Sequence, residues 1–174
     1  MPTTTDEPPT TPSRATVSRG PFFIGEMPLT VDDKGRLLVP AEVRRQMERG
    51  DESTFIILRG KNQQIWLYPE RYYEERVAPE SDDPVPDDDE LDYMLTVLGQ
   101  ASRLTPDKAG RVVLPEGTVD RKQLGREVML VGVRNHLQLW NRQDYLEYRE
   151  TKDRQRAEIA DRYKAVKDRR RAAG

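Results

Sequence analysis

The chain lacks cysteine, has a single histidine and contains no long run of apolar residues. Without cysteine there is no disulfide, no thiolate metal site and no cysteine nucleophile, and the lone His136 excludes a cluster of histidine ligands. No stretch approaches the ~18 consecutive apolar residues of a membrane span. The first residues also lack the basic start and apolar run of a secretory signal. We therefore expect a soluble, cytoplasmic protein with no membrane partner.

Apolar residues are few overall. Hydrophobic residues make up 35% and charged residues 34% of the 174 positions, whereas globular domains average roughly 45–50% apolar and about 25% charged residues. A chain of this length forms one ordinary domain or two very small ones. We expect a compact core in only part of the chain, with solvated ends or a long charged helix in the rest.

The net charge of −2 hides an uneven distribution. Residues 61–90 carry three basic and ten acidic side chains, a net −7, so the rest of the chain sums to +5. Binding to a polyanion depends on the local potential rather than on the total charge. The distribution therefore permits binding to nucleic acid without demonstrating it.

Two segments are predicted to lie outside any core. Residues 1–20 are rich in Thr and Pro and have almost nothing to bury, which predicts a disordered tail. Residues 79–90 include the run ESDDPVPDDDE, which predicts an exposed acidic linker or the frayed start of the next helix. Its carboxylates could hold Mg²⁺ or Ca²⁺. The run lacks the glycine turn and the spaced ligands of a calcium loop, so we predict no metal site.

An internal repeat is the most informative feature. Residues 32–40 (DDKGRLLVP) are matched 75 positions later by residues 107–115 (DKAGRVVLP), and both follow the pattern D-x-x-G-R, three aliphatics, Pro. Downstream, residues 55–60 (FIILRG) are echoed by residues 127–132 (EVMLVG), an offset of 72. Two landmarks recurring in the same order indicate that one unit occurs twice.

Each unit is predicted to be β-β-α-β-β. In the D-x-x-G turn, Asp bonds nearby backbone donors and Gly accepts a positive φ; apolar segments on both sides predict a strand, a tight turn and a strand. Pro40 suits the first turn of a helix, on which Val43 and Met47 share one face. A unit of ~50 residues is too small for a good core alone. We therefore expect residues 21–78 and 91–145 to pack together.

The remaining segments receive simpler predictions. After Pro115, Gly117 costs a helix roughly 1 kcal/mol, so the second unit has the weaker helix. Residues 146–174 lack turn signals and predict a long charged helix, docked near Tyr145 and solvated beyond it. Residues 169–171 are all Arg, which either contact phosphate or, more simply, complement the helix C-terminus. Core or cover positions are predicted for Trp66, Tyr68, Leu139 and Trp140.

Residues 23–26 (FIGE) leading into 32–37 (DDKGRL), with the second D-x-x-G-R block and 131–140 (VGVRNHLQLW), resemble the bacterial MraZ family. The resemblance covers about residues 22–145. It implies an α+β, β-rich fold of tandem AbrB-like (SpoVT-AbrB) units in a swapped-hairpin β-barrel. It also implies homo-oligomers, such as rings, that bind short direct repeats in double-stranded DNA and regulate the division and cell-wall gene cluster.

The residue chemistry then suggests how DNA would be contacted. Arg presents a planar fork that bonds O6 and N7 of guanine, which favours Arg36 and Arg111 for base or close-groove contact. Lys is a point charge suited to phosphate, which favours Lys34 and Lys108. An Asp four residues before each Arg equally allows a purely structural ion pair.

Other candidates have a structural explanation as well. The two arginines in the predicted first helix, Arg44 and Arg45, are candidates for contacts to the DNA backbone, and an ordinary solvated helix face explains them equally. Holding the turns is the role predicted for Asp32, Gly35, Asp107 and Gly110.

We therefore expect a DNA-binding transcriptional regulator, acting as a repressor at the nucleoid. Residues 91–98 carry no basic side chain, where the family commonly has arginines, so a monomer should bind weakly and depend on avidity. The alternative is an oligomeric interaction module on the same fold, antitoxin-like or a scaffold, that has lost DNA binding. The acidic linker and the charged C-terminal segment favour it.

An enzyme is not expected. The sequence has no nucleophile elbow, no phosphate-cradling glycine loop and no set of metal ligands, so we predict no cofactor and no small-molecule substrate. His136, placed by the pattern in a hairpin turn, is expected to be a surface residue rather than a catalytic base.

Overall fold

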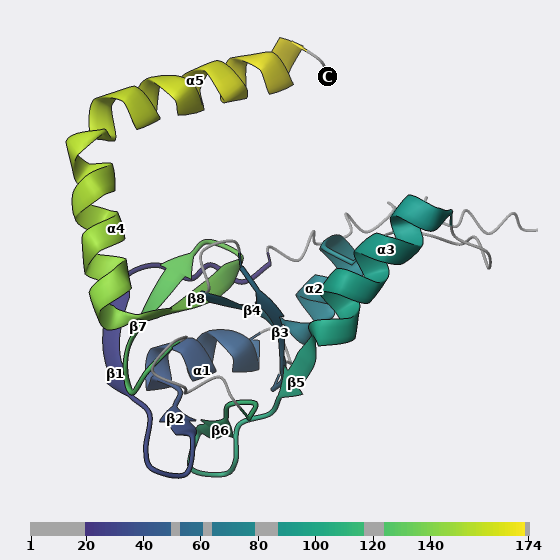
Figure 1. Ribbon diagram of the computed structural model, residues 1–174, viewed down its shortest axis with the longest axis vertical. Coiled ribbons are helices and arrows are strands. Elements are labelled where there is room, and N and C mark those ends of the chain that lie inside the picture. Colours follow the sequence, from purple (N-terminus) through teal and green to yellow (C-terminus); the bar gives the residue numbers. More distant parts are fainter. Residues whose placement is uncertain (1–19, 50–52, 61–63, 79–86, 117–123, 173–174) are drawn as a thin grey trace, which may run out of the picture.

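The computed structural model describes residues 20–49, 53–60, 64–78, 87–116 and 124–172. Its strands follow the predicted repeat (Figure 1). In each unit the D-x-x-G turn precedes a short strand, and the two apolar segments further along the chain form a hairpin. The elements are β1 (Glu26–Thr30), β2 (Arg36–Leu38), α1 (Ala41–Arg49), β3 (Phe55–Arg59), β4 (Ile65–Pro69), α2 (Glu70–Arg76), α3 (Asp88–Val97), η1 (Leu98–Gln100), β5 (Ser102–Leu104), β6 (Arg111–Val113), β7 (Glu127–Val133), β8 (His136–Asn141), α4 (Arg142–Arg154) and α5 (Arg156–Ala172).

The two units exchange strands. β1 of the first unit pairs antiparallel with β7 of the second, and β5 of the second pairs with β3 of the first. The hairpins β3–β4 and β7–β8 meet where β4 pairs with β8. The result is one six-stranded sheet in the order β1-β7-β8-β4-β3-β5, which is not closed. Because each unit completes the sheet of the other, two small units share one core. The α+β fold class is confirmed, although the sheet does not close into the expected β-barrel, because β1 and β5 at its two edges do not pair with each other.

A second, two-stranded sheet contains β2 and β6, one strand from each unit. The sequence predicts that β2 pairs with the strand before its own turn, but that contact is reduced to a single bridge between Val31 and Leu37. β2 instead aligns antiparallel with β6 over its full length. We call this pair the β2–β6 ribbon.

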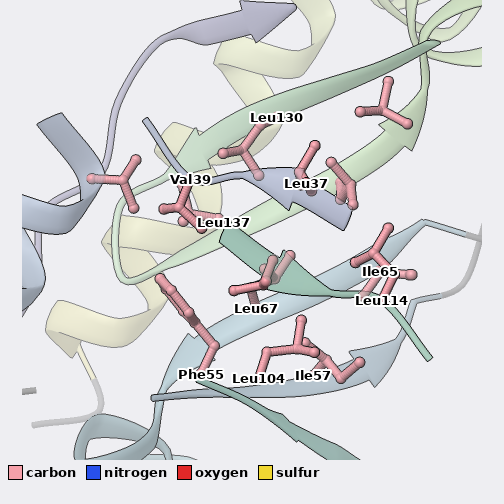
Figure 2. Close-up of a cluster of buried hydrophobic side chains, with 14 of the residues drawn as sticks. Leu37, Val39, Phe55, Ile57, Ile65, Leu67, Leu104, Leu114, Leu130 and Leu137 are labelled. Atoms are coloured by element: carbon pink, nitrogen blue, oxygen red, sulfur yellow. The ribbon is translucent and has the colours of Figure 1, made fainter. Parts of the chain in front are cut away.

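The main core is built from both units (Figure 2). Strands alternate their side chains between two faces, so Leu37 of β2 and Val112 of β6, each 1% exposed, point into the core. There they join side chains of β3, β4, β7 and β8. On α1, Val43 and Met47 are buried on one face, as predicted. Further buried members of this cluster are Phe55, Ile57, Leu67, Leu104, Leu130, Leu137 and Leu139.

Two smaller clusters lie outside the main core. Tyr68 packs with Tyr73, and Trp140 packs with Tyr145. Tyr68, Leu139 and Trp140 are buried and Trp66 is partly buried, so the prediction of core and cover positions is confirmed.

Helix α3 begins inside the segment predicted as an acidic linker. The Asp87 side chain caps it by accepting a hydrogen bond of 2.8 Å from the Glu90 amide. Acidic residues in the first turn suit the positive end of the helix dipole, which explains why residues 88–90 at the end of this run are helical. Residues 79–86 of the linker, residues 1–19 of the predicted tail and residues 117–123 of the predicted second helix lie outside the described residues.

The charged C-terminal segment is helical, as predicted, and breaks at Gln155 (φ −98°, ψ 11°) into α4 and α5, which point in different directions (Figure 1). Tyr145 docks α4 on the sheet: it is buried, and its hydroxyl donates a hydrogen bond of 2.6 Å to Glu26 on β1. Arg149 donates to the same carboxylate at 2.5 Å. No residue of α5 is buried. No described helix has the length and apolar character needed to cross a membrane.

The sequence predicts that His136 is a surface residue in a hairpin turn, and this prediction is wrong. His136 is the first residue of β8, is partly buried and stacks on Tyr68 with 4.6 Å between ring centroids. Desolvation by this burial lowers the pKa of its imidazole. The turn prediction was wrong because the strand extends to His136 through its pairing with Val133.

Candidate nucleic-acid interface

The first repeated turn is held by the carboxylate of Asp32. One of its oxygens accepts hydrogen bonds of 2.9 Å from the amides of Lys34 and Arg36, and its carbonyl accepts one of 3.0 Å from the Gly35 amide. Gly35 has a φ of +71°, a conformation that residues with a Cβ rarely adopt. The Arg36 amide, and then its guanidinium, lower the pKa of the Asp32 carboxyl, so it stays ionised at neutral pH.

The second turn repeats this geometry. Asp107 accepts hydrogen bonds of 2.8 and 2.9 Å from the amides of Ala109 and Arg111, and Gly110 has a φ of +82°. The pKa of Asp107 is lowered by the amide of Arg111 and then by its guanidinium. The four turn residues named from the sequence therefore occupy equivalent positions in two equivalent loops.

Each arginine pairs with the aspartate of its own turn. Arg36 Nε lies 2.7 Å from Asp32, and Arg111 Nη2 lies 3.0 Å from Asp107. The side chains of Arg36 and Arg111 remain 32% and 42% exposed. The arginines are thus fixed in direction by the aspartates while still reaching solvent.

The β2–β6 ribbon brings the two turns side by side at one end of the molecule (Figure 1). The carbonyl of Gly35 accepts a hydrogen bond of 2.9 Å from the amide of Leu114, and the carbonyl of Gly110 accepts one of 2.9 Å from Val39. Each turn is therefore attached to the strand that leaves the other. The two turns and their strands are thus related by an approximate two-fold symmetry.

The outward face of the ribbon follows from its register. Arg36 lies opposite Val113, and Leu38 lies opposite Arg111, with the buried pair Leu37 and Val112 between them. Residues directly opposite in an antiparallel pair project from the same face. Both arginines therefore project from one outward face.

A family model described as "MraZ protein, putative antitoxin-like" matches the chain twice, over residues 22–91 and 97–167. This chain belongs to the MraZ family. The two matches correspond to the two units of the repeat. The second match includes α4 and most of α5, so the resemblance extends further than the limit near residue 145 expected from the sequence.

Curated relatives agree with this assignment. A protein of Moorella thermoacetica is 31% identical over 137 residues, covering 78% of this chain and 93% of its own length. A protein of an Arthrobacter species is 29% identical over 140 residues, 80% of this chain and 96% of its own. A protein of Clavibacter michiganensis is 30% identical over 127 residues, covering 73% of this chain and 86% of its own length. All three are named "Transcriptional regulator MraZ". The MraZ family is thus one of transcriptional regulators, which is not a class of enzyme.

The other basic residues predicted for the site differ in position. Lys34 and Lys108 are exposed in the two turns, and neither forms a salt bridge among the described residues. Arg44 lies against Gly110 and donates to the Val39 carbonyl at 3.2 Å, so it belongs to the same end of the molecule. Arg45 is exposed, and no hydrogen bond or ion pair within the described chain connects it to the turns.

Three residues near the turns were not predicted. Arg126 pairs with the exposed Asp33 at 2.5 Å, which neutralises one of the acidic groups beside the first turn. No sequence signal links these two positions. Leu38 and Val113 are the other two; they stand next to the arginines on the outward face. The alternation of side chains in a strand would have placed them there.

The described residues contain no group of three or more His, Cys, Asp or Glu side chains arranged to hold a metal ion. The aspartates of the turns are engaged with backbone amides and arginine. The chemistry that this end of the molecule offers is therefore that of a cationic surface with hydrogen-bond donors.

Proposed function

We propose that this chain binds double-stranded DNA sequence-specifically through the outward face of the β2–β6 ribbon and its two turns. The observation that carries the proposal is the placement of Arg36 and Arg111, equivalent residues of two units, on one exposed face. The MraZ relatives support a regulatory role. We further propose that the chain acts in the cytoplasm, at the nucleoid, as a repressor of the division and cell-wall gene cluster, and that a homo-oligomer, such as a ring, engages short direct repeats.

The ribbon suits a DNA groove in shape. The major groove of B-DNA is about 12 Å wide and admits a two-stranded β-ribbon, and proteins that read DNA with strands use this geometry. A ribbon entering the groove would bring both arginines to the base edges. Lys34 and Lys108, at the tips of the turns, would then face the phosphates on either side.

The ion pairs with aspartate are compatible with base contact. Arg36 Nε donates to Asp32, which leaves its terminal nitrogens without a hydrogen bond within the described chain. A guanidinium held by one edge has lost part of its conformational freedom before binding, so less entropy is lost on contact with guanine. Structural pairing and DNA contact, alternatives from the sequence alone, are therefore roles that one side chain can combine.

The charge at this end of the molecule is positive but modest. Asp32, Asp33 and Asp107 are each paired with an arginine. Lys34, Lys108 and Arg44 carry charges that none of the salt bridges among the described residues neutralises. Since non-specific affinity rises with the number of phosphates neutralised, one chain would bind weakly. Several chains on several repeats would gain affinity through effective concentration.

The proposal is tested with the DNA upstream of the chain's own gene and a scrambled duplex, by fluorescence anisotropy at two salt concentrations. Wild-type protein should prefer the upstream duplex. The double variant Arg36→Ala/Arg111→Ala should lose that preference, by about five- to 150-fold per arginine. Lys34→Ala/Lys108→Ala should weaken binding to both duplexes equally and reduce the salt dependence.

A matched control separates DNA contact from folding. Arg71 and Arg154 form exposed i,i+4 pairs with Glu75 and Glu150 on helices α2 and α4, with the same sequence spacing as the pairs in the turns. Arg71→Ala/Arg154→Ala should leave DNA binding unchanged. Exposed pairs contribute about 0.2–1 kcal/mol each, so both double variants should keep nearly the wild-type melting temperature. A large drop for the turn variant alone would mean that its arginines are structural.

The alternative function, an interaction module without DNA binding, has one observation in its favour. No residue of α5 is buried, and the Tyr163 side chain on it is 67% exposed. If wild-type protein gives no anisotropy change with either duplex at low salt, the DNA proposal fails and this alternative takes its place.

A further inference from the structure

The outward face of the β2–β6 ribbon carries two apolar side chains between its charged groups. Leu38 is 54% exposed and Val113 is 62% exposed, although each adjoins a residue that is 1% exposed, Leu37 and Val112. Strand alternation accounts for their direction. It does not account for their apolar character, because a solvated face of a two-stranded sheet favours polar residues.

Each of these side chains has an arginine as its direct cross-strand neighbour. Leu38 lies opposite Arg111, and Val113 lies opposite Arg36. Directly opposite residues have Cβ atoms ~4.5–5.5 Å apart. The face therefore presents two equivalent pairs, each with one guanidinium and one branched aliphatic group, related by the approximate two-fold symmetry of the units.

Such a pair matches the edge of a short base sequence. In the major groove, guanine offers O6 and N7 to arginine, and thymine offers its 5-methyl group to apolar side chains. Neighbouring base pairs are stacked ~3.4 Å apart, comparable with the separation of the two side chains in each pair. We propose that Leu38 and Val113 contact thymine 5-methyl groups and select thymine beside the guanines that Arg111 and Arg36 contact. This inference rests on the proposed function, since it requires the ribbon to enter the major groove.

The surroundings favour DNA as the occupant over a second protein. Lys34, Lys108 and Arg44 carry unneutralised positive charges at the same end of the molecule, as a polyanion requires. A stable protein interface covers ~800 Å² per partner with an apolar centre. Two aliphatic side chains on a ribbon of three residue pairs, each facing a charged arginine, fall short of that.

The test removes the 5-methyl group of thymine and leaves every hydrogen-bonding atom of the base unchanged. Duplexes are selected from a randomised pool by the wild-type chain, and each thymine of the selected sequence is replaced in turn by deoxyuridine. Wild-type protein should lose about two- to tenfold in affinity at the thymines that it contacts. The variant Leu38→Ala/Val113→Ala should bind the thymine and deoxyuridine duplexes equally, while still preferring guanine at the arginine positions.

The control variant is Leu95→Ala/Val133→Ala, which truncates an exposed Leu and an exposed Val elsewhere in the chain. It should retain the full deoxyuridine effect. If wild-type protein enriches a sequence but is indifferent to every deoxyuridine, the methyl contact is disproved and the DNA-binding proposal stands. If it enriches no sequence, the DNA-binding proposal itself fails. If Leu38→Ala/Val113→Ala instead lowers the molar mass in solution and keeps the deoxyuridine effect, the pair belongs to an interface between copies.

Discussion

The side chain of Arg44 lies so close over Gly110 that a Cβ on residue 110 would come within 2.6 Å of Arg44 Nε. Arg44 also donates a hydrogen bond of 3.2 Å to the Val39 carbonyl. Helix α1 of the first unit therefore braces the turn of the second. Gly110 is constrained twice, by this contact and by its φ of +82°, whereas Gly35, with a φ of +71°, has no such atom within 4 Å.

Gly110→Ala should therefore destabilise the protein more than Gly35→Ala. Each substitution places a Cβ in the left-handed region, which costs about 1–2 kcal/mol. At residue 110 the Cβ must also displace the flexible end of the Arg44 side chain, which donates a hydrogen bond to Val39, so a small additional cost is expected. The free energies of unfolding in urea measure the difference.

The Arg44→Ala background supplies the control. Without the Arg44 side chain the crowding disappears and the left-handed φ remains, so the two glycine substitutions should cost the same. A difference that persists in this background would show that the asymmetry has another source.

Leu37 and Leu38 are adjacent and chemically identical, but their truncation should have different consequences. Leu37 is 1% exposed in the shared core, so Leu37→Ala should cost about 2–5 kcal/mol. Leu38 is 54% exposed, so Leu38→Ala should change stability by no more than about 0.5 kcal/mol. Thermal and urea unfolding report both values, and Val112→Ala against Val113→Ala repeats the comparison in the second unit. Equal effects within a pair would mean that the register of the ribbon is different.

Local features of this fold were predictable from the sequence. The turns depend on an Asp and a Gly within four residues of each other, and the inner face of α1 depends on the spacing of Val43 and Met47. Both are short-range patterns with one physical solution, and both appear as predicted. The doubled pattern also predicted that two units would share a core, since neither could bury one alone.

Strand pairs between residues distant in the chain were harder to predict from the sequence. The predicted hairpin keeps one bridge, Val31 to Leu37, because β2 pairs instead with β6 from the other unit. The strand preference of the nearby residues does not distinguish between these two partners of β2. The burial of Leu37 in the shared core favours pairing with β6. The ion pair between Arg126 and Asp33 depends on the same exchange of strands. The membership of Leu38 in the candidate site follows from the strand period alone and was available in the sequence.

The single histidine occupies a hydrogen-bond network that fits its neutral form. Trp140 Nε1 donates to Gln138 at 3.0 Å, so the Gln138 amide nitrogen, 3.2 Å from His136 Nε2, donates to the ring. Asn135 donates its amide to the Tyr72 hydroxyl at 2.8 Å, so its oxygen, 2.9 Å away, accepts from His136 Nδ1. This arrangement assigns the proton to Nδ1 and leaves Nε2 as an acceptor.

Protonation of His136 would add a second donor facing the Gln138 donor, and it would place a charge among Tyr68 and Trp66. Both effects agree with a pKa lowered by burial below the ordinary 6.5. As the pH falls below 6.5, the unfolded chain therefore takes up a proton before the folded chain does, and stability declines until the folded pKa is reached. Above 6.5 the group contributes no pH dependence.

The expected result is a His136 C2–H resonance that titrates below pH 6.5 in the folded protein, unambiguous in an NMR spectrum because the chain has one histidine. His136→Gln should flatten the decline of the free energy of unfolding between pH 6.5 and the folded pKa, because it removes the group that protonates. A resonance that titrates at or above 6.5 would contradict burial of the neutral ring. It would instead support the solvent-exposed position predicted for His136 from the sequence.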